Sequence, residues 1–377
     1  MKKIRKKVVI IQRVFTNYRK PLIELLKDIL DKKNIDLVFI YGQCTKEEAK
    51  KADNADLDWG CKVKNKYLPF GFVWQPLHKE LFDADLVIVE QANKLLLNYC
   101  LFILRPLFKM KIGFWGHGWC HQQKPNSFSN KFKNLLVNKV DWWFAYTSNV
   151  VKYLEQHGVN RNKITDVQNS IDTKEIKEYK KHITYSDIQN FREKHSIPQG
   201  AFIGAYCGGI YKEKQIRFLL ESAKEVISSS DRFYLLVIGG GPDVDIVLDA
   251  VRESDRIIYV GPKFGKDKAI HLSASHLLLV PSAVGLVVLD SFIFGVPIIT
   301  TEHNTHGPEF SYIENGKNGI VTKHEKKAYA EEIVKCISSN DRRNEIASNA
   351  IKDGEKYTIE NMANNFLEGI QTAIHTK

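Results

Sequence analysis

The residues Val280 to Gly319, VPSAVGLVVLDSFIFGVPIITTEHNTHGPEFSYIENGKNG, decide the fold that we expect for this chain. They read as the end of an apolar strand, a glycine-bearing turn, a helix over 285–294 and a second strand over 296–301, with a break at Gly295. A helix that begins beside a strand end presents free backbone N–H groups and the positive end of its dipole, which suits a diphosphate. Taken alone, the segment is more often an ordinary strand–helix–strand unit of an α/β domain.

The same alternation of strand and helix extends over the whole chain, which predicts parallel, doubly wound sheets. In the first half, strands are expected at 8–11, 36–41, 86–90, 111–115 and 142–145, and helices at 21–30 and 149–157. In the second half, strands are expected at 202–206, 234–238, 257–260 and 277–280, and helices at 216–228, 244–251, 267–273, 326–338 and 359–374. The polar, charged stretch 173–195 separates the two halves. We therefore expect a first domain over 1–175, a linker over 176–198 and a second domain over 199–358.

Composition and charge narrow the class of protein. The chain has 377 residues, of which 44% are hydrophobic, and six scattered cysteines that favour reduced thiols over a disulfide framework or a zinc site. Neither a signal peptide nor a membrane-spanning stretch is expected, because the apolar run at 95–104 is about half the length of a span. Residues 1–200 hold 35 Lys and Arg against 21 Asp and Glu, whereas the remainder is slightly acidic. The basic half indicates either a polyanionic partner or a solvated surface.

Two glycine-rich turns follow expected strands of the second half. Gly208-Gly209 precedes a helix, with Lys214 just inside the turn, where a lysine can meet a diphosphate. The turn Gly239-Gly240-Gly241 is conformationally costly, which suggests close approach by another group. The chain contains neither G-x-G-x-x-G nor G-x-x-x-x-G-K-S/T, which disfavours a nicotinamide enzyme and a P-loop ATPase.

Two further segments carry candidate chemistry in the first half. Phe114-Trp115-Gly116-His117-Gly118 places a histidine between glycines at the end of a strand, where it faces a cleft or fills a structural role. Residues 169–172, NSID, read by themselves as a turn that an asparagine side chain stabilises.

In their order along the chain these segments resemble the GT-B retaining glycosyltransferases of family 4. Residues 12–26, QRVFTNYRKPLIELL, resemble the first loop and helix, which assigns Gln12, Tyr18 and Arg19 to the acceptor side. The segment at 114–118 resembles the one that carries the active-site histidine, and 169–172 resembles the N-G-I/V-D element before the domain crossing. The last segment, 359–377, resembles the helix that returns to the first domain. The resemblance implies an α/β fold with two Rossmann-like domains facing a cleft.

In the second domain, residues 208–223, GGIYKEKQIRFLLESA, resemble G-R-L-x-x-E-K-G-x-x-x-L-L-x-A, and 281–297 resemble P-S-x-x-E-G-F-G-L-x-x-L-E-A-x-x-x-G-x-P. Residues 261–265 take the place of the segment that meets the nucleotide base. The resemblance implies that His117, Lys214 and Asp290 are the catalytic residues, with Asp290 as the partner of the ribose hydroxyls. It assigns the nucleotide sugar to Gly208, Gly209, Lys214, Lys263, Phe264, Ala283, Val284, Gly285, Leu286, Asp290 and Glu309.

Two departures from the family pattern concern the sugar and the diphosphate. The first Glu of the family's acidic pair has no counterpart, because the turn is shortened to Ser282-Ala283-Val284-Gly285. Gly209 stands where the family usually has an arginine. We therefore expect a remodelled sugar pocket, in which Glu309 is a candidate for the missing carboxylate.

The function implied by the resemblance is retaining, metal-independent transfer of a hexosyl group from a nucleotide-diphosphate sugar. The acceptor is expected to be a glycan or a lipid-linked sugar in surface polysaccharide synthesis, with no other cofactor and no nucleic acid as partner. The expected location is the cytoplasm, with peripheral attachment to the anionic inner face of the membrane. Three alternatives stay open: a GT-B nucleotide-sugar epimerase, a nucleic-acid-binding protein that uses the basic half, and a non-catalytic transferase partner.

Overall fold

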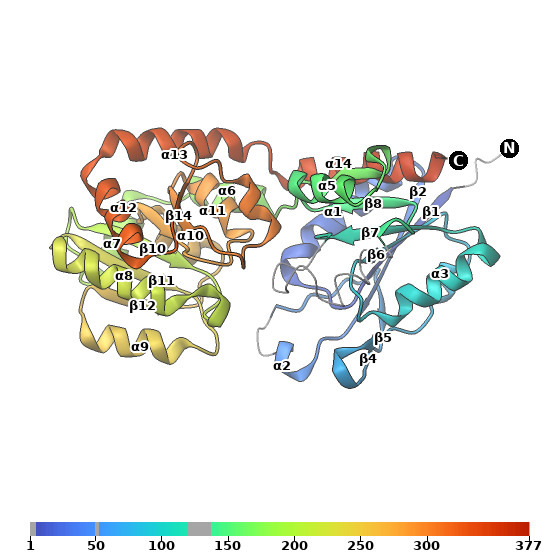
Figure 1. The fold of residues 1–377 in the computed structure, drawn as a ribbon, viewed down its shortest axis with the longest axis horizontal. Coiled ribbons are helices and arrows are strands. Elements are labelled where there is room, and N and C mark those ends of the chain that lie inside the picture. Colours follow the sequence, from blue (N-terminus) through green and yellow to red (C-terminus); the bar gives the residue numbers. More distant parts are fainter. Residues whose placement is uncertain (1–4, 50–52, 119–136, 377) are drawn as a thin grey trace. The chain divides into compact units, whose positions relative to one another are not determined.

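The computed structural model describes residues 5–49, 53–118 and 137–376, and the chain divides into two compact units. Unit 1 comprises Met1–Asp172 and Ile359–Lys377, and unit 2 comprises Thr173–Thr358. The final helix, α14 (Ile359–His375), therefore completes unit 1 although unit 2 precedes it in the sequence (Figure 1).

Unit 1 is built on a parallel sheet of seven strands in the order β3-β2-β1-β6-β7-β8-β9. The strands are β1 (Lys6–Gln12), β2 (Ile35–Gly42), β3 (Cys61–Val63), β6 (Leu86–Glu90), β7 (Lys111–Gly116), β8 (Trp142–Ala145) and β9 (Ile164–Asp166). In the described residues of unit 1, the helices besides α14 are α1 (Lys20–Asp31), α2 (Lys46–Ala49), α3 (Leu96–Phe108) and α5 (Ser148–Gln156). A small antiparallel hairpin of β4 (Lys66–Tyr67) and β5 (Val73–Trp74) is attached beside the sheet.

The core of unit 1 follows the two-residue period of its strands. Val8 and Ile10 of β1 join the cluster with α1 and α14, whereas Val9 and Ile11 join the cluster with α3 and α5. Successive side chains of a strand point to opposite faces, so a strand covered on both faces is apolar throughout. This explains why β1 and β6 read as uninterrupted apolar runs.

Unit 2 repeats the design with a parallel sheet of six strands in the order β12-β11-β10-β13-β14-β15. The strands are β10 (Phe202–Cys207), β11 (Phe233–Ile238), β12 (Ile257–Gly261), β13 (Leu277–Leu279), β14 (Ile298–Thr301) and β15 (Ile320–Thr322). The helices are α6 (Thr173–Lys181), α7 (Tyr185–Lys194), α8 (Ile216–Ser229), α9 (Val244–Glu253), α10 (Gly265–Ser273), α11 (Val287–Phe294), α12 (Lys326–Ser338) and α13 (Asn340–Gly354). The expected α/β class with two Rossmann-like domains is confirmed.

The segment 176–198, for which we expected a linker, forms most of α6 and α7 and belongs to unit 2. Thr184 and Asp187 cap α7 reciprocally, and Phe191 is buried near His271 of α10. The charge of this segment therefore reflects the solvent-facing sides of two packed helices.

Each sheet has its first strand in an interior position, so consecutive crossovers leave in opposite directions from one point. In unit 1 this point lies between β1 and β6, and in unit 2 between β10 and β13. In open α/β sheets ligands bind beyond the carboxyl ends of the strands at such points. In the described parts of the chain, none of the helices combines the length and the apolar character needed to cross a bilayer.

Candidate active site

In unit 2, the two glycine turns contact each other at the carboxyl ends of β10 and β11. The N–H of Ile210 donates to the carbonyl of Gly240 over 2.8 Å. A Cβ atom on Gly239 would lie 1.8 Å from the carbonyl oxygen of Gly208, and one on Gly241 would lie 2.1 Å from that of Ile210. The costly run of three glycines, which we interpreted as a sign of close approach by another group, is thus explained by the backbone of the first glycine turn.

Lys214 ends a short 3-10 helix, Lys212–Lys214, that follows the Gly208-Gly209 turn. Its ammonium group donates to the carbonyl of Ala283 over 2.6 Å, while Ser282 Oγ donates to the carbonyl of Glu213 over 2.8 Å. These two bonds join the loop after β10 to the loop after β13. Burial lowers the pKa of Lys214 to about 8, against the opposing effects of Cys207 and Glu309.

The shortened turn before α11 holds its backbone amides in two different ways. The N–H of Val284 donates to Nδ1 of His306 over 3.0 Å. This amide, which we had assigned to the nucleotide sugar, therefore already has a hydrogen-bond acceptor within the protein. His306 must then carry its proton on Nε2, which donates to the carbonyl of Thr301. No acceptor for the N–H of Gly285 or Leu286 occurs in the described residues. These two amides and the start of α11 are the part of the turn that could receive an anion.

Asp290 lies in the first turn of α11 and is buried. Its Oδ2 atom accepts a bond of 2.7 Å from the ammonium group of Lys268 on α10. Its Oδ1 atom is buried and has no hydrogen-bond partner in the described residues. Burial lowers the pKa of Lys268, but the combined effects of Asp290 and Cys207 outweigh burial and raise the pKa of this lysine. The sequence analysis missed Lys268, because nothing in the local pattern of α10 marks one of its lysines as the partner of a buried carboxylate.

Glu309 lies in the first turn of a 3-10 helix, Pro308–Tyr312, and is buried. Its Oε2 atom lies 3.8 Å from the position of a Cβ atom on Gly285. The carboxylate therefore lies beside the shortened turn that lacks the family's first Glu, and it acts on the pKa of Lys214. Lys214, Gly285 and Glu309, which are far apart in the sequence, are brought together.

The segment expected to meet the nucleotide base lies at the start of α10. Phe264 precedes the helix and its side chain is 78% exposed, and Lys263 is half-buried beside it. Phe264 has no ring contact with other described residues. Its exposed face is available for stacking.

In unit 1, a cavity of about 440 Å³ opens at the carboxyl ends of β1, β6 and β7, at the switch point of the sheet. Gln12, Tyr18, Arg19 and His117 all line it, together with Glu90. The expected acceptor-side residues and the expected histidine therefore share one cavity. His117 is exposed, and its ring lies 4.3 Å from that of Tyr146.

Arg19 is buried and mainly holds this cavity together. Its guanidinium donates to Asn169 Oδ1 over 2.7 Å and to the Tyr146 hydroxyl over 3.1 Å, and it lies 4.6 Å from the ring centre of Trp115. Asn169 thus links the segment before unit 2 to the first helix region. We therefore assign Arg19 a positioning role at the edge of the cavity.

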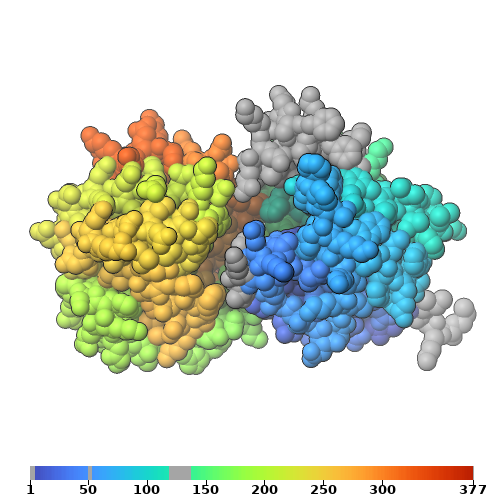
Figure 2. All heavy atoms as spheres, turned by 90° about the horizontal axis from the view of Figure 1, so that it is seen from below, coloured from blue at the N-terminus to red at the C-terminus, as the bar shows by residue number. Residues whose placement is uncertain are grey.

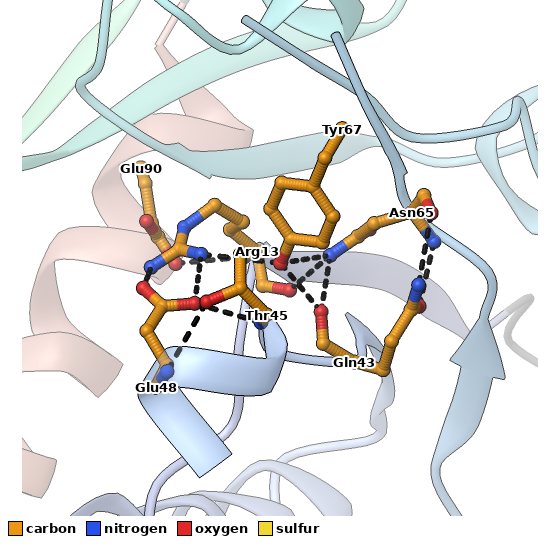
Figure 3. A network of polar contacts seen from close by, with 7 residues as sticks. All are labelled: Arg13, Gln43, Thr45, Glu48, Asn65, Tyr67 and Glu90. Carbon is orange, nitrogen blue, oxygen red and sulfur yellow. Dashed lines mark hydrogen bonds and ion pairs between the residues drawn. The ribbon is translucent and has the colours of Figure 1, made fainter. Parts of the chain in front are cut away.

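Glu90 and Arg13 are cavity residues that the sequence analysis missed. The N–H of Arg13 donates to Glu90 Oε1 over 2.8 Å, and the guanidinium of Arg13 forms a two-pronged pair with Glu48 (Figure 3). Burial raises the pKa of Glu90, opposed by Arg13 and Arg19, whereas Arg13 lowers the pKa of Glu48 to about 2. The position of Glu90 at the end of an apolar strand was the available signal.

The described residues contain no cluster of three His, Cys, Asp or Glu side chains with the geometry of a metal site. The sequence has Asp-x-Asp triplets, a pattern that can hold a metal ion, at 56–58, 83–85 and 243–245. Asp56 is paired with Lys62, Asp83 with Lys7 and Asp85 with Lys6. Asp243 and Asp245 lie at the start of α9.

Nearly the whole chain is similar in fold to the solved structure of Anabaena Alr3699/HepE in complex with UDP and glucose. The TM-score is 0.70 at 15% identity, covering 97% of this chain and 100% of the other. The two Rossmann-like units define the GT-B architecture. Residues 201–339, within unit 2, match the model of the family described as glycosyl transferases group 1.

The chain spans about half the length of the curated relatives that it matches. The chain is 28% identical over 199 residues to the capsular polysaccharide biosynthesis glycosyltransferase CapM of Staphylococcus aureus, covering 48% of this chain and 51% of CapM. It is 26% identical over 183 residues to alpha-monoglucosyldiacylglycerol synthase of Acholeplasma laidlawii, covering 47% of this chain and 44% of the synthase.

Proposed function

We propose that this protein is a retaining glycosyltransferase that moves a hexosyl group, without a metal ion, from a nucleotide-diphosphate sugar to a glycan or lipid-linked acceptor. The observation that carries the proposal is the convergence of Lys214, the free amides of Gly285 and Leu286, and the start of α11 at the switch point of unit 2.

The groups at this point suit a leaving diphosphate. When the bond between sugar and phosphate breaks, negative charge develops on the phosphate oxygens, and prearranged donors stabilise it. Lys214 supplies a positive charge, and the two amides supply neutral donors. A phosphate oxygen takes the proton of the acceptor hydroxyl as that hydroxyl attacks the sugar. Transfer with retention of configuration therefore needs no strong protein base.

Asp290 and Glu309 are assigned to the neutral parts of the donor. A buried carboxylate oxygen without a partner is costly, and a ribose hydroxyl would supply the missing donor to Asp290 Oδ1. Glu309 lies where a carboxylate beside Gly285 can accept bonds from sugar hydroxyls. Phe264 and Lys263 are assigned to the base.

The unit 1 cavity is proposed to hold the acceptor. Carboxylates accept bonds from sugar hydroxyls, and the rings of Tyr18 and Tyr146 offer apolar faces. His117 is proposed to contact the acceptor or the transferred sugar. The names of CapM and of alpha-monoglucosyldiacylglycerol synthase support a surface polysaccharide or a lipid as the acceptor class. Because such acceptors are made at a membrane, we propose that the enzyme is cytoplasmic and attached to an anionic membrane surface.

A thermal-shift series tests the donor class. UDP, GDP, TDP, ADP and CMP and their common sugar conjugates are added with and without EDTA, and short DNA and RNA serve as controls. A ligand at 100 times its dissociation constant adds about 2.7 kcal/mol to the stability of the state that binds it. We expect stabilisation by one nucleotide family, unchanged by EDTA, and no response to nucleic acid.

Other outcomes identify the alternatives. A response to nucleic acid alone would favour a binding protein. If no nucleotide stabilises the protein and Lys214→Ala leaves its function unchanged, a non-catalytic partner would be favoured. Conversion of a bound nucleotide sugar into a different nucleotide sugar without any acceptor would identify an epimerase.

A further inference from the structure

The β4–β5 hairpin of unit 1 exposes a continuous set of apolar side chains. Its loop, Leu68 to Phe72, includes the 3-10 turn Pro69–Gly71, at whose centre Phe70 is 89% exposed. Tyr67, Leu68 and Phe72 of the same hairpin also have exposed large apolar side chains. Single exposed apolar residues are ordinary, whereas a contiguous group marks an interaction surface. In Figure 2 the light-blue part of unit 1, to which the hairpin belongs, lies on the face turned towards the reader.

The base of the hairpin is held firmly, so the exposure of its tip is a built feature. Gln43 exchanges two hydrogen bonds of 2.8 and 2.7 Å with the backbone of Asn65, and the Asn65 side chain donates to the carbonyl of Arg13 over 2.8 Å (Figure 3). The Tyr67 hydroxyl donates to the carbonyl of Gln43 over 2.6 Å. These bonds fix the direction in which the loop projects, while the ring of Phe70 contacts no other ring of the described residues.

The charge around the hairpin is positive, and apart from Lys62, which pairs with Asp56, several of its lysines have no charged partner in the described residues. From Trp59 to Lys79 the sequence contains lysines but no Asp or Glu. Lys64, Lys66 and Lys94 are exposed and have no ion-pair or hydrogen-bond partner for their ammonium groups in the described residues. Lys94 lies next to the tip, because its Nζ atom is 2.8 Å from the position of a Cβ atom on Gly71.

The basic residues Arg5 to Lys7, by contrast, form ion pairs within unit 1. Arg5 pairs with Asp31 and Asp36, Lys6 with Asp85, and Lys7 with Glu80 and Asp83. Among the described residues, Lys64, Lys66 and Lys94 are therefore freer to meet an anionic surface than Arg5, Lys6 and Lys7.

We propose that the β4–β5 hairpin docks unit 1 on an anionic lipid bilayer, with Phe70 inserted among the acyl chains and Lys64, Lys66 and Lys94 at the headgroups. Aromatic rings suit the boundary between water and lipid, and lysines near an anionic leaflet add electrostatic attraction. This inference deepens the proposed function and rests on its membrane-linked acceptor. Arg13 joins hairpin and cavity, since it donates to the Tyr67 hydroxyl and lines the cavity. A docked hairpin thus places the cavity near the headgroups.

Vesicle sedimentation tests the proposal. The full chain is mixed with vesicles of phosphatidylcholine alone, or of phosphatidylcholine and phosphatidylglycerol in equal parts, at low and high salt. The variants are Phe70→Ala and the double substitution Lys64→Gln/Lys66→Gln. The matched controls, Tyr185→Ala and Lys323→Gln/Lys327→Gln, alter an exposed aromatic residue and exposed lysines of unit 2. Stabilisation by nucleotide is measured for each variant.

We expect the unchanged protein to sediment with the anionic vesicles at low salt. Phe70→Ala should lower the partition coefficient about tenfold or more, because a buried phenylalanine side chain is lost from the lipid. The lysine double variant should lose about tenfold on anionic vesicles at low salt and little at high salt. The controls and nucleotide stabilisation should not change.

Three results would overturn the proposal: no binding of the unchanged protein to anionic vesicles at low salt, equal binding by Phe70→Ala, or equal losses in the unit 2 controls. If vesicle binding fails while nucleotide stabilisation is intact, docking is wrong and the proposed transferase stands. Self-association of the unchanged protein that Phe70→Ala abolishes, without vesicle binding, would instead assign the hairpin to a contact between copies of the chain.

Discussion

The ammonium group of Lys268 lies 2.7 Å from Oδ2 of the buried carboxylate of Asp290. Removing one partner of a buried pair leaves the other charge uncompensated, which typically costs 3–5 kcal/mol. We expect Lys268→Met to lower the free energy of unfolding by about 3 kcal/mol in urea denaturation. Lys266→Met is the control on the same helix, because it breaks only the surface pair with Asp187 and should cost less than about 1 kcal/mol. Equal effects of the two substitutions would contradict the structural role of the buried pair.

Lys214 should give opposite pH dependences to nucleotide binding and to stability. Its pKa is about 8 in the folded protein, against an ordinary value of 10.5, so it loses its charge as the pH rises through 8. Titration calorimetry should therefore show weaker binding of a nucleoside diphosphate above this pH. Between pH 8 and 10.5 the unfolded chain binds more protons at this site, so its contribution to the stability of the unliganded protein rises with pH.

The control for this prediction is Lys212→Met, which changes an exposed lysine of the same 3-10 helix. It should preserve both pH dependences, whereas Lys214→Met should weaken binding and remove its change near pH 8. Binding that is independent of pH in the unchanged protein would exclude Lys214 from the diphosphate site.

Glu309→Gln should impair sugar transfer more than nucleotide binding. A hydrogen bond to a charged group contributes about 1.5–3 kcal/mol, so the turnover rate should fall about tenfold or more. Stabilisation by the nucleoside diphosphate, which lacks the sugar, should persist. Glu314→Gln is the control, since Glu314 pairs with Lys317 at the surface of the following loop. Unchanged turnover of Glu309→Gln would remove this residue from the sugar site.

Gly239→Ala should disturb the contact between the two glycine turns. The new Cβ atom would lie 1.8 Å from the carbonyl oxygen of Gly208, so one of the turns must move. We expect a loss of about 3 kcal/mol in the free energy of unfolding, the upper end for overpacking, together with weaker nucleotide binding. Gly261→Ala is the control: its φ is also positive, at 71°, but nothing lies within 4 Å, so only the backbone cost of about 1 kcal/mol applies. Similar losses in both variants would contradict the steric explanation.

Phe366→Ala should destabilise unit 1 specifically. Phe366 of α14 is buried, and its ring lies 5.0 Å from that of Phe144 and 4.9 Å from that of Trp115. Truncation of a buried phenylalanine costs about 3–5 kcal/mol. Limited proteolysis should then cleave unit 1 before unit 2, whereas Glu368→Ala, on the exposed side of α14, should behave as the unchanged protein. Earlier cleavage of unit 2 would show that α14 does not stabilise unit 1.

Long and strongly patterned elements were predictable from the sequence. The structure confirms the strands expected at 86–90 and 142–145 and the helix at 326–338 with the same bounds. Their apolar residues follow the period of one secondary structure, and their ends carry turn residues. The shorter elements β3, β9 and β15 were missed, because three residues at the edge of a sheet give no period. The helix α13 was also missed, because its pattern is polar.

The residues of the candidate site likewise fall into those that the sequence predicted and those that it did not. Lys214 and Asp290 were found because they lie in motifs with a fixed place between strand and helix. Lys268, Glu90 and His306 were missed, because their importance arises only when separate segments meet. The availability of an amide is equally a tertiary property, since Val284 lost its free N–H to a histidine that lies 22 residues further along the chain.

The placement of α14 has a consequence for biosynthesis. Unit 2 consists of one uninterrupted stretch, whereas unit 1 needs residues that follow it. On the ribosome, residues 173–358 can therefore reach their native fold while the first 172 residues still lack the helix that closes their core. Unit 1 is synthesised first but completes its fold last. The apolar sheet face that α14 covers stays exposed until unit 2 has been synthesised.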